Sequence, residues 1–480
     1  MTRSWRRLLG CPLAIGMVAV CAGLALAAPR PRVAAAPLTE AQARQIGTEA
    51  YVYGIPLLAF IRQQRTQTSV TVPNALSDAP LNRLGNQLNF ASVAHQVIVA
   101  PNVDTLYSMA HLDLGAGPLV LHVPAVPDHH YYVFEFIDPF TNVFHYVGTR
   151  TTGDGAGNYA IVGPAFHGRL PAGLHRITSA YANVWIAGRT LVYGARGLAA
   201  AHRIQDGYRL LALADFERFG LGYRWPRPRR VITTHTVATI PTGLAFLDAL
   251  GTALADNPPP ERDARILGQL ASAGIGAGRH PSAEHLPAAT IAGLEAGVAA
   301  GPAQVLADRT DVVVRSVIKH HGWYVAPSNI GNFGTDYALR SVVAVFGIAA
   351  NIPVEAMYPV GSVDSAGALL NGADRYVIHI TKGDFPPVRF YWSFTAYDHS
   401  LYLVPNAVHR YAISQFTPGV KDNADGSLDI YLQSTPPAGH ASNWLPTPPA
   451  GQFEVILRMY GPKRPALDGT YSYPPIVRQS

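Results

Sequence analysis

Two blocks of the sequence, residues 97–193 and 354–480, consist of short runs in which apolar and polar residues alternate. Turn clusters separate the runs, such as Gly115-Ala116-Gly117-Pro118 and Gly153-Asp154-Gly155 in the first block. A period of two places successive side chains on opposite faces of a β-strand, and many short strands at this spacing are typical of a sandwich or jelly roll. The pattern therefore predicts one β unit in each block.

The residues between the two blocks follow a helical pattern. Leu244, Leu247, Leu250 and Leu254 form an apolar stripe, and the stretches 261–273, 302–320 and 335–350 also have helical character. Another helix is predicted after a capping box formed by Thr39 and Gln42, and Pro56 is expected to kink or end its first part. The predicted fold class is α+β, mainly β, with two β-sandwich (jelly-roll-like) domains joined by a helical section.

The N-terminus has the layout of a secretory signal peptide. Three arginines (Arg3, Arg6 and Arg7) precede an apolar run from Leu8 to Ala27 that ends in small residues. An uncleaved membrane anchor is the alternative, although Pro12 breaks the run early. We expect cleavage near Ala27 and an exported protein, located in the periplasm, the cell envelope or outside the cell. No transmembrane segment is expected after cleavage.

Cleavage would change both the charge and the chemistry of the chain. The net charge of +6 would fall by the three arginines to +3. Both cysteines, Cys11 and Cys21, lie inside the export segment, so the mature protein would have no thiol and no disulfide. No nucleic-acid motif is present, and nucleic acid is not an expected partner. No metal is assigned, because the histidines do not form a His-Glu-x-x-His motif, and the cofactor stays unknown.

Several motifs resemble two known families. Val52-Tyr53-Gly54, Asn102-Val103-Asp104-Thr105-Leu106-Tyr107-Ser108, Thr141-Asn142 and Gly188-Arg189-Thr190 resemble the family called domain of unknown function 1254 (DUF1254). Tyr358, Phe390-Tyr391-Trp392-Ser393, Asn443-Trp444-Leu445-Pro446 and Arg458-Met459-Tyr460 resemble its usual companion, DUF1214. The resemblance covers most of residues 40–478 and implies two β-sandwich domains joined by helices, often exported. It supplies no substrate.

Pattern and resemblance together give a predicted domain organisation. We expect a signal peptide over residues 1–27, a leader and N-terminal helical segment over 28–95, a DUF1254-like β-sandwich over 96–200, a helical linker or insert over 201–353 and a DUF1214-like β-sandwich over 354–480.

Candidate catalytic residues lie in the first β unit. On a strand, Asn102 and Asp104 would point the same way and Tyr107 would lie on the opposite face, unless a turn intervenes; Pro101 just before them indicates an irregular entry. An amide beside a carboxylate could position a water, a sugar hydroxyl or a cation. Asp104 could instead staple a turn through backbone N–H groups. Glu135 stands among apolar neighbours, where burial would raise its pKa and suit it to general acid catalysis. It could equally join an ion pair with Arg150.

Candidate ligand-binding residues lie in the second β unit. Tyr391 and Tyr397 share one strand face with polar residues, which suits sugar stacking, a solvated surface or a subunit interface. Trp392 is the third aromatic candidate of this strand, although it is expected on the opposite face, together with core residues. Asn443 and Trp444 belong to a Pro-rich loop that could line a pocket. Arg458 is expected on the polar face of the last long strand, paired with a carboxylate.

These residues allow two functions of different classes. The first is a cofactor-independent enzyme of hydrolase or lyase type, acting on a small hydroxyl-rich or ester-like molecule, carbohydrate included, by general acid–base chemistry. The second is a non-catalytic ligand-binding or envelope-associated protein, in which the aromatic faces serve homo-oligomerisation or attachment. An enclosed pocket lined by Asp104 and Glu135 would favour the enzyme.

Overall fold

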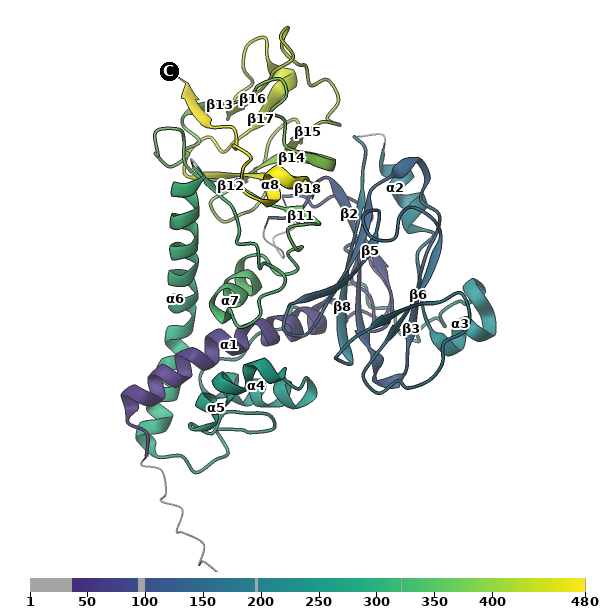
Figure 1. Ribbon diagram of the computed structural model, residues 1–480, viewed down its shortest axis with the longest axis vertical. Helices are drawn as coiled ribbons and strands as arrows, with labels where there is room; N and C mark the ends of the chain where they lie inside the picture. Colours follow the sequence, from purple (N-terminus) through teal and green to yellow (C-terminus); the bar gives the residue numbers. More distant parts are fainter. Residues whose placement is uncertain (1–36, 94–99, 195–196, 321, 480) are drawn as a thin grey trace, which may run out of the picture. The chain divides into compact units, whose positions relative to one another are not determined.

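The computed structural model describes residues 37–93, 100–194, 197–320 and 322–479 (Figure 1). The expected signal peptide, residues 1–27, lies outside them, and so do its two cysteines. Within the described ranges, no helix combines the length and the apolar character needed to cross a bilayer.

The first sandwich consists of two sheets formed between residues 85 and 212. The five-stranded sheet has the order β1 (Gly85–Asn86), β2 (Thr105–Asp113), β8 (Asn183–Leu191), β4 (Tyr132–Ile137), β5 (Val143–Gly148), and the four-stranded sheet has the order β7 (His175–Thr178), β6 (Gly157–Val162), β3 (Leu119–Val123), β9 (Arg209–Ala212). Every neighbouring pair is antiparallel except β6 and β7. Leu112, Phe134 and Ile161 belong to the core between these sheets.

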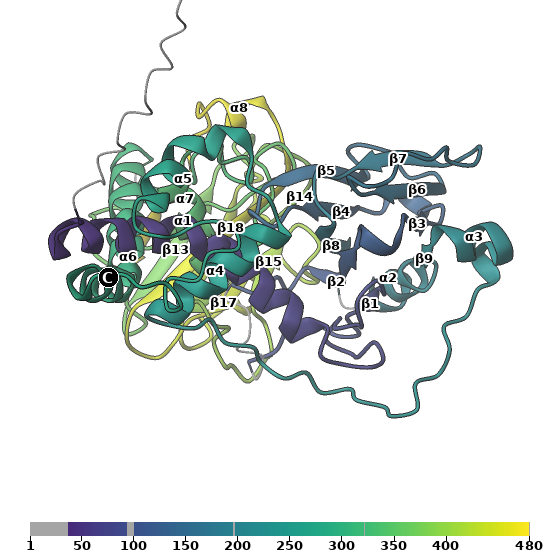
Figure 2. The same cartoon turned by 90° about the horizontal axis from the view of Figure 1, so that it is seen from below.

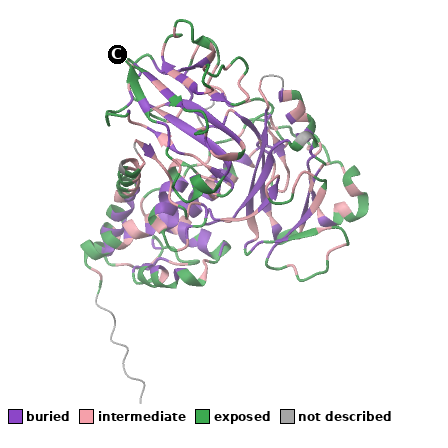
Figure 3. Cartoon of the chain, turned by 45° about the horizontal axis from the view of Figure 1, so that its top comes forward, coloured by how far each residue is buried: buried purple, intermediate pink, exposed green. Residues whose placement is uncertain are grey.

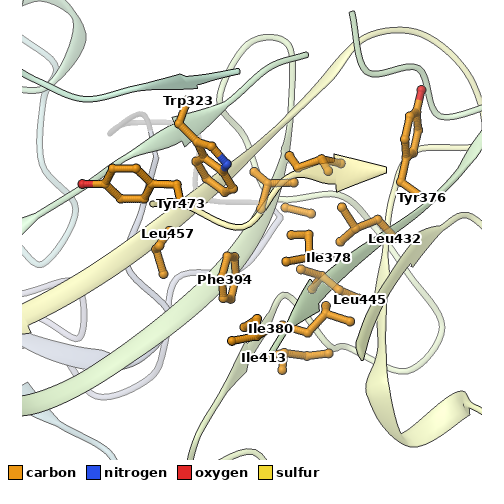
Figure 4. Close-up of a cluster of buried hydrophobic side chains, with 14 of the residues drawn as sticks. Trp323, Tyr376, Ile378, Ile380, Phe394, Ile413, Leu432, Leu445, Leu457 and Tyr473 are labelled. Atoms are coloured by element: carbon orange, nitrogen blue, oxygen red, sulfur yellow. The ribbon is translucent and has the colours of Figure 1, made fainter. Parts of the chain in front are cut away.

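The second sandwich is formed mainly by residues 356–479. One sheet has the order β10 (Trp323–Tyr324), β12 (Val360–Gly361), β18 (Phe453–Pro462), β14 (Val388–Asp398), β15 (Ala412–Ser414), with β11 (Ala356–Met357) also paired to β18; the other has the order β17 (Trp444–Pro446), β16 (Leu428–Gln433), β13 (Arg375–Ile380), β19 (Ile476–Gln479). Figure 4 shows the core between them, where Phe394 and Leu457 face Ile378 and Ile380.

Helices α1 (Glu40–Gln67), α4 (Leu244–Asp256), α5 (Ala264–Ala271), α6 (Ala288–Lys319) and α7 (Tyr337–Phe346) pack on one another. The capping box at Thr39 and Gln42 is present. Gly47 and Gly297 allow α1 and α6 to approach closely, because a Cβ at either position would overlap the other helix. Of the two outcomes expected at Pro56, a kink or the end of the helix, the second does not occur: α1 continues through Pro56, where the surrounding residues are buried.

The predicted fold class is confirmed, as both strand-rich blocks form sandwiches and the segment between them is largely helical. Short helices α2 (Leu198–Gln205), α3 (Leu213–Phe219) and α8 (Arg464–Leu467) complete the fold. Figure 2 shows residues 223–243 as an extended strap from α3 to α4. Figure 3 shows that buried residues follow the strands of both sandwiches. The exact domain boundaries stay a prediction.

Candidate functional site

The outer faces of the two largest sheets, those containing β2 and β18, are buried against each other within this chain. On β14 and β18, the side chains that point away from the core of Figure 4 are Tyr391, Ser393, Thr395, Tyr397, Ile456, Arg458 and Tyr460. All seven are buried. Tyr131 and Val133 of the first sandwich pack on Tyr391 and Tyr460. This face is therefore neither solvated nor an interface between subunits.

Asp104 and Arg458 form the polar centre of this contact. The Ser393 hydroxyl donates a hydrogen bond to Asp104 Oδ2 at 2.5 Å, across 289 residues of sequence. Arg458 donates to Thr395 Oγ1 at 2.7 Å, to the Tyr397 hydroxyl at 2.5 Å and to the Ala100 carbonyl at 2.9 Å. Burial raises the pKa of the Asp104 carboxyl, although the Arg458 charge and the Ser393 hydrogen bond oppose that rise.

A side chain does staple a turn at this point through backbone N–H groups, but it belongs to Asn102 and not to Asp104. Its Oδ1 accepts the backbone N–H groups of Asp104 at 2.7 Å and Thr105 at 3.2 Å, and its Nδ2 donates to the Tyr460 hydroxyl at 2.9 Å. Asn102 and Asp104 do not lie on a strand with Tyr107: β2 begins only at Thr105, and the alternative of an irregular entry before it is the one found. Asn102 and Tyr107 instead line the same cavity.

Glu135 is fully buried on the outer face of β4 and pairs with Arg189 of β8. Arg189 Nη1 lies 2.8 Å from Glu135 Oε2, and Arg189 Nη2 donates to the Ala349 carbonyl at 2.8 Å. Within the described residues, no hydrogen-bond partner reaches Glu135 Oε1. Burial raises the pKa of Glu135 to about 7, despite the opposing charge of Arg189.

Arg150 pairs with a carboxylate other than Glu135. Its Nε lies 2.5 Å from Glu355 Oε2, and the Tyr131 hydroxyl donates to Glu355 Oε1 at 2.7 Å. Glu355 immediately precedes β11, so this ion pair also joins the two sandwiches. The expected pair between Glu135 and Arg150 is replaced by two separate pairs, Glu135 with Arg189 and Glu355 with Arg150.

A cavity of ≈ 230 Å³ lies beside these groups, along the outer face of β18. Its polar lining includes Asn102, Tyr107, Arg189, Tyr358, Arg458 and Tyr460, while Val343, Ile348, Val360 and Ile456 are among its apolar lining residues. Asp104 and Glu135 do not line the cavity; they lie behind the arginines. Most polar side chains of the lining are therefore cationic or hydroxyl donors, and Glu454 is the carboxylate among them.

Two donors of the cavity wall are open to a ligand. Among the residues that the structure describes, none hydrogen-bonds the Tyr107 hydroxyl, and the Arg189 guanidinium lies over the Tyr107 ring at 5.7 Å. Arg189 donates to Glu135 and Ala187 through Nη1 and to Ala349 through Nη2. Because a guanidinium has five N–H donors, these three hydrogen bonds leave further donors for a ligand. These donors suit a carboxylate, carbonyl or hydroxyl oxygen.

The other predicted site residues lie outside the cavity lining. Tyr391 stacks on Tyr460 at a centroid distance of 4.4 Å, and Tyr397 donates to the Pro101 carbonyl at 2.7 Å. Trp392 belongs to the core of the second sandwich. Asn443 is hydrogen-bonded to the backbone of Lys421 and Asp429, and the Trp444 indole donates to the Gln433 carbonyl at 2.8 Å. These five side chains therefore stabilise the fold through contacts within the protein and do not line the cavity.

The sequence reasoning did not single out Arg189, Glu355, Tyr358, Tyr460 or Arg309 for the site. A signal existed for Arg189, which is the charged residue in the otherwise apolar and uncharged run of β8, Val184 to Leu191. In the described part of the chain, no three His, Cys, Asp or Glu side chains gather in a way that could hold a metal ion.

Comparison with known proteins matches two parts of the chain to known domain families. Residues 81–212 match the family described as Protein of unknown function (DUF1254), and residues 355–464 match Protein of unknown function (DUF1214). No curated protein matches the chain. The crystal structure of the VPA0106 protein from Vibrio parahaemolyticus has a similar fold, with a TM-score of 0.66 and 20% identity over 91% of this chain and 100% of that chain. A putative uncharacterized protein from Burkholderia cenocepacia aligns with a TM-score of 0.43 and 13% identity, over 90% of this chain and 88% of that one.

Proposed function

Because this chain belongs to the family in which a DUF1254 domain precedes a DUF1214 domain, we propose that it binds a small organic molecule in the cavity where those domains meet. The observation that carries the proposal is the cavity itself, which has hydrogen-bond donors at one end and apolar walls beyond them. Its volume of ≈ 230 Å³ is below the roughly 300–1,000 Å³ of pockets for drug-sized ligands, so the ligand is small.

The lining favours one of the two ligand classes that we expected. A hydroxyl-rich molecule needs polar partners on all sides, since a buried hydroxyl without a hydrogen bond is costly. Val343, Ile348, Val360 and Ile456 offer none through their side chains. An ester or carboxylate with an apolar body matches both the donors and the apolar walls.

A thermal-shift experiment tests this function. The purified protein is heated with methyl hexanoate, octanoate, 1-octanol or glucose. We expect at least one of the first three to raise the midpoint and glucose to leave it unchanged. Ile456→Phe, which fills the cavity, abolishes the shift, whereas Val314→Phe on the exposed side of α6 retains it. Equal shifts in both variants, or no shift in any protein, would refute binding in this cavity.

A second candidate function is general acid–base catalysis on the same ligand. Glu135 is the group that could carry it, because its pKa of about 7 matches the working range of such a group and its Oε1 has no hydrogen-bond partner among the described residues. It does not line the cavity, so it would exchange its proton with the ligand through a water molecule. In this version Glu135→Gln abolishes turnover of 4-nitrophenyl hexanoate, and the rate of the parent protein changes with a midpoint near pH 7. An unchanged rate in Glu135→Gln would leave binding as the function.

We also propose that the protein is exported. The support is the sequence of residues 1–27, with its arginines, apolar run and small-residue end. Intact-mass measurement on the protein from the periplasmic and membrane fractions tests it. A mature chain beginning near residue 28 is the expected result, and a full-length chain found in the cytosol would contradict export.

A further inference from the structure

The cavity has a direction, which follows from the spacing of residues on β18. Glu454, Ile456, Arg458 and Tyr460 are two residues apart and all line it. At about 3.3 Å per residue, the cavity wall from Glu454 to Tyr460 is on the order of 20 Å long. Glu454 is half-buried while the other three are buried. The Glu454 end is therefore the mouth, and the Tyr460 end is the deep end.

The two ends differ in chemistry. At the deep end, Arg189, Arg458 and Asn102 join the hydroxyls of Tyr107, Tyr358 and Tyr460. At the mouth, Arg309 of α6 lies over the Phe346 ring at 4.9 Å, and Glu454 carries the opposite charge. The middle is apolar, because Val360 of β12 pairs directly with Ile456. A ligand that fills this space is elongated, with a polar head and an apolar body.

The charge at the deep end selects an anionic head group. Two guanidinium groups line the deep end: Arg189 forms an ion pair with Glu135, whereas Arg458 hydrogen-bonds neutral groups, among them Thr395 and Tyr397. A planar carboxylate matches the fork geometry of an arginine, whereas an ammonium head would meet two cations. An alcohol could accept hydrogen bonds from the tyrosine hydroxyls and the guanidinium groups, but it carries no negative charge to complement the two cations.

We propose that the ligand is a monocarboxylate with an unbranched apolar chain, its carboxylate between Arg189 and the Tyr107 hydroxyl and its chain directed along Ile456 toward Arg309. This inference rests on the proposed function, because it names the ligand of the same cavity. It identifies Tyr107, Arg189 and Arg458 as the residues that determine specificity, and it assigns Arg309 to the entrance.

Isothermal titration calorimetry with three ligands of one chain length tests the head group. We expect octanoate to bind at least about tenfold more tightly than 1-octanol, and octylamine more weakly than both, because only the carboxylate has a negative charge that complements the guanidinium donors. If all three bind equally and Ile456→Phe removes them all, the head-group inference is overturned while binding in the cavity stands. If none of the three binds, both proposals fail.

Two variants test the orientation of the ligand. Tyr107→Phe should weaken octanoate binding by about 2- to 10-fold, the effect of losing one hydrogen bond. Arg309→Gln at the mouth should change it by less than Tyr107→Phe does, and Arg315→Gln, an exposed position of the same helix, should leave it unchanged. If Arg309→Gln weakens octanoate binding more than Tyr107→Phe does, the carboxylate lies at the entrance and the proposed orientation is wrong.

Discussion

Strands β14 and β18 have two faces that are equally buried but chemically opposite. The inner face carries Trp392, Phe394, Val455 and Leu457 into the core of Figure 4. The outer face carries the tyrosines, Ser393, Thr395 and Arg458 against the first sandwich. Burial alone therefore does not distinguish a core from a site. The distinction lies in whether buried side chains require specific partners.

The comparison separates two kinds of contribution to the fold. Apolar side chains on the inner face gain from any neighbour that excludes water, in proportion to the area they bury. Polar side chains on the outer face lose their hydrogen bonds to water on burial. Only particular hydrogen bonds within the protein, such as that of Ser393 with Asp104, offset this cost. We expect inner-face substitutions to change stability most, and outer-face substitutions to change ligand binding or pH dependence.

The largest effect is expected on the inner face. Phe394→Ala should lower the free energy of unfolding by about 3–5 kcal/mol, because it leaves a cavity among fully buried side chains. Urea denaturation measures this loss. Phe219→Ala at a half-exposed position is the matched control and should change stability by less than about 0.5 kcal/mol. Similar losses in the two variants would contradict the assignment of this face as core.

The next effect concerns the pH dependence of the outer face. In the folded chain the pKa of Glu135 is about 7, against 4.5 when unperturbed, so the folded state binds the proton more tightly. Between these values the unfolded state releases the proton first, and stability falls as pH rises, by on the order of 2–3 kcal/mol in all. Free energies of unfolding, measured by urea denaturation from pH 4 to 8, should fall in this way in the parent protein and less steeply in Glu135→Gln. Parallel curves would contradict it.

A smaller loss is expected at the contact between the sandwiches. Ser393→Ala removes the hydroxyl that donates to Asp104 and leaves a buried carboxylate oxygen without it, at a cost of about 1–3 kcal/mol. Ser400→Ala, on an exposed turn, should be near neutral. A neutral Ser393→Ala in urea denaturation would show that water replaces the hydroxyl and that the two sandwiches are not held together there.

The smallest effect on stability is expected at Tyr107. The hydroxyl group has no hydrogen-bond partner among the described residues, so Tyr107→Phe should change the free energy of unfolding by less than about 0.5 kcal/mol while weakening octanoate binding. Differential scanning calorimetry with and without octanoate measures both quantities. A clear loss of stability without ligand would assign this hydroxyl to the framework.

The sequence predicted elements better than it predicted partners. Period-two alternation located the two strand-rich blocks, 97–193 and 354–480, because alternation reflects a local property of the backbone. It also predicted correctly that Glu135 would be buried. Its partner could not be deduced: Arg150 is nearer in sequence, but the register of β4 and β8 pairs Arg189 with Val133, two residues from Glu135 on the same face of the sheet. Contacts such as Asp104 with Ser393 depend on how two distant sheets meet, which no local pattern encodes.

The central claim is that an unbranched carboxylate occupies the cavity along β18 in one orientation. The most direct test is a crystal structure of the protein with 8-bromooctanoate, in which the anomalous signal of bromine locates the far end of the chain. We predict a bromine peak on the Arg309 side of Ile456 and the carboxylate within hydrogen-bond distance of Arg189 or Tyr107. A peak outside the cavity, or bromine at the deep end, would contradict the account.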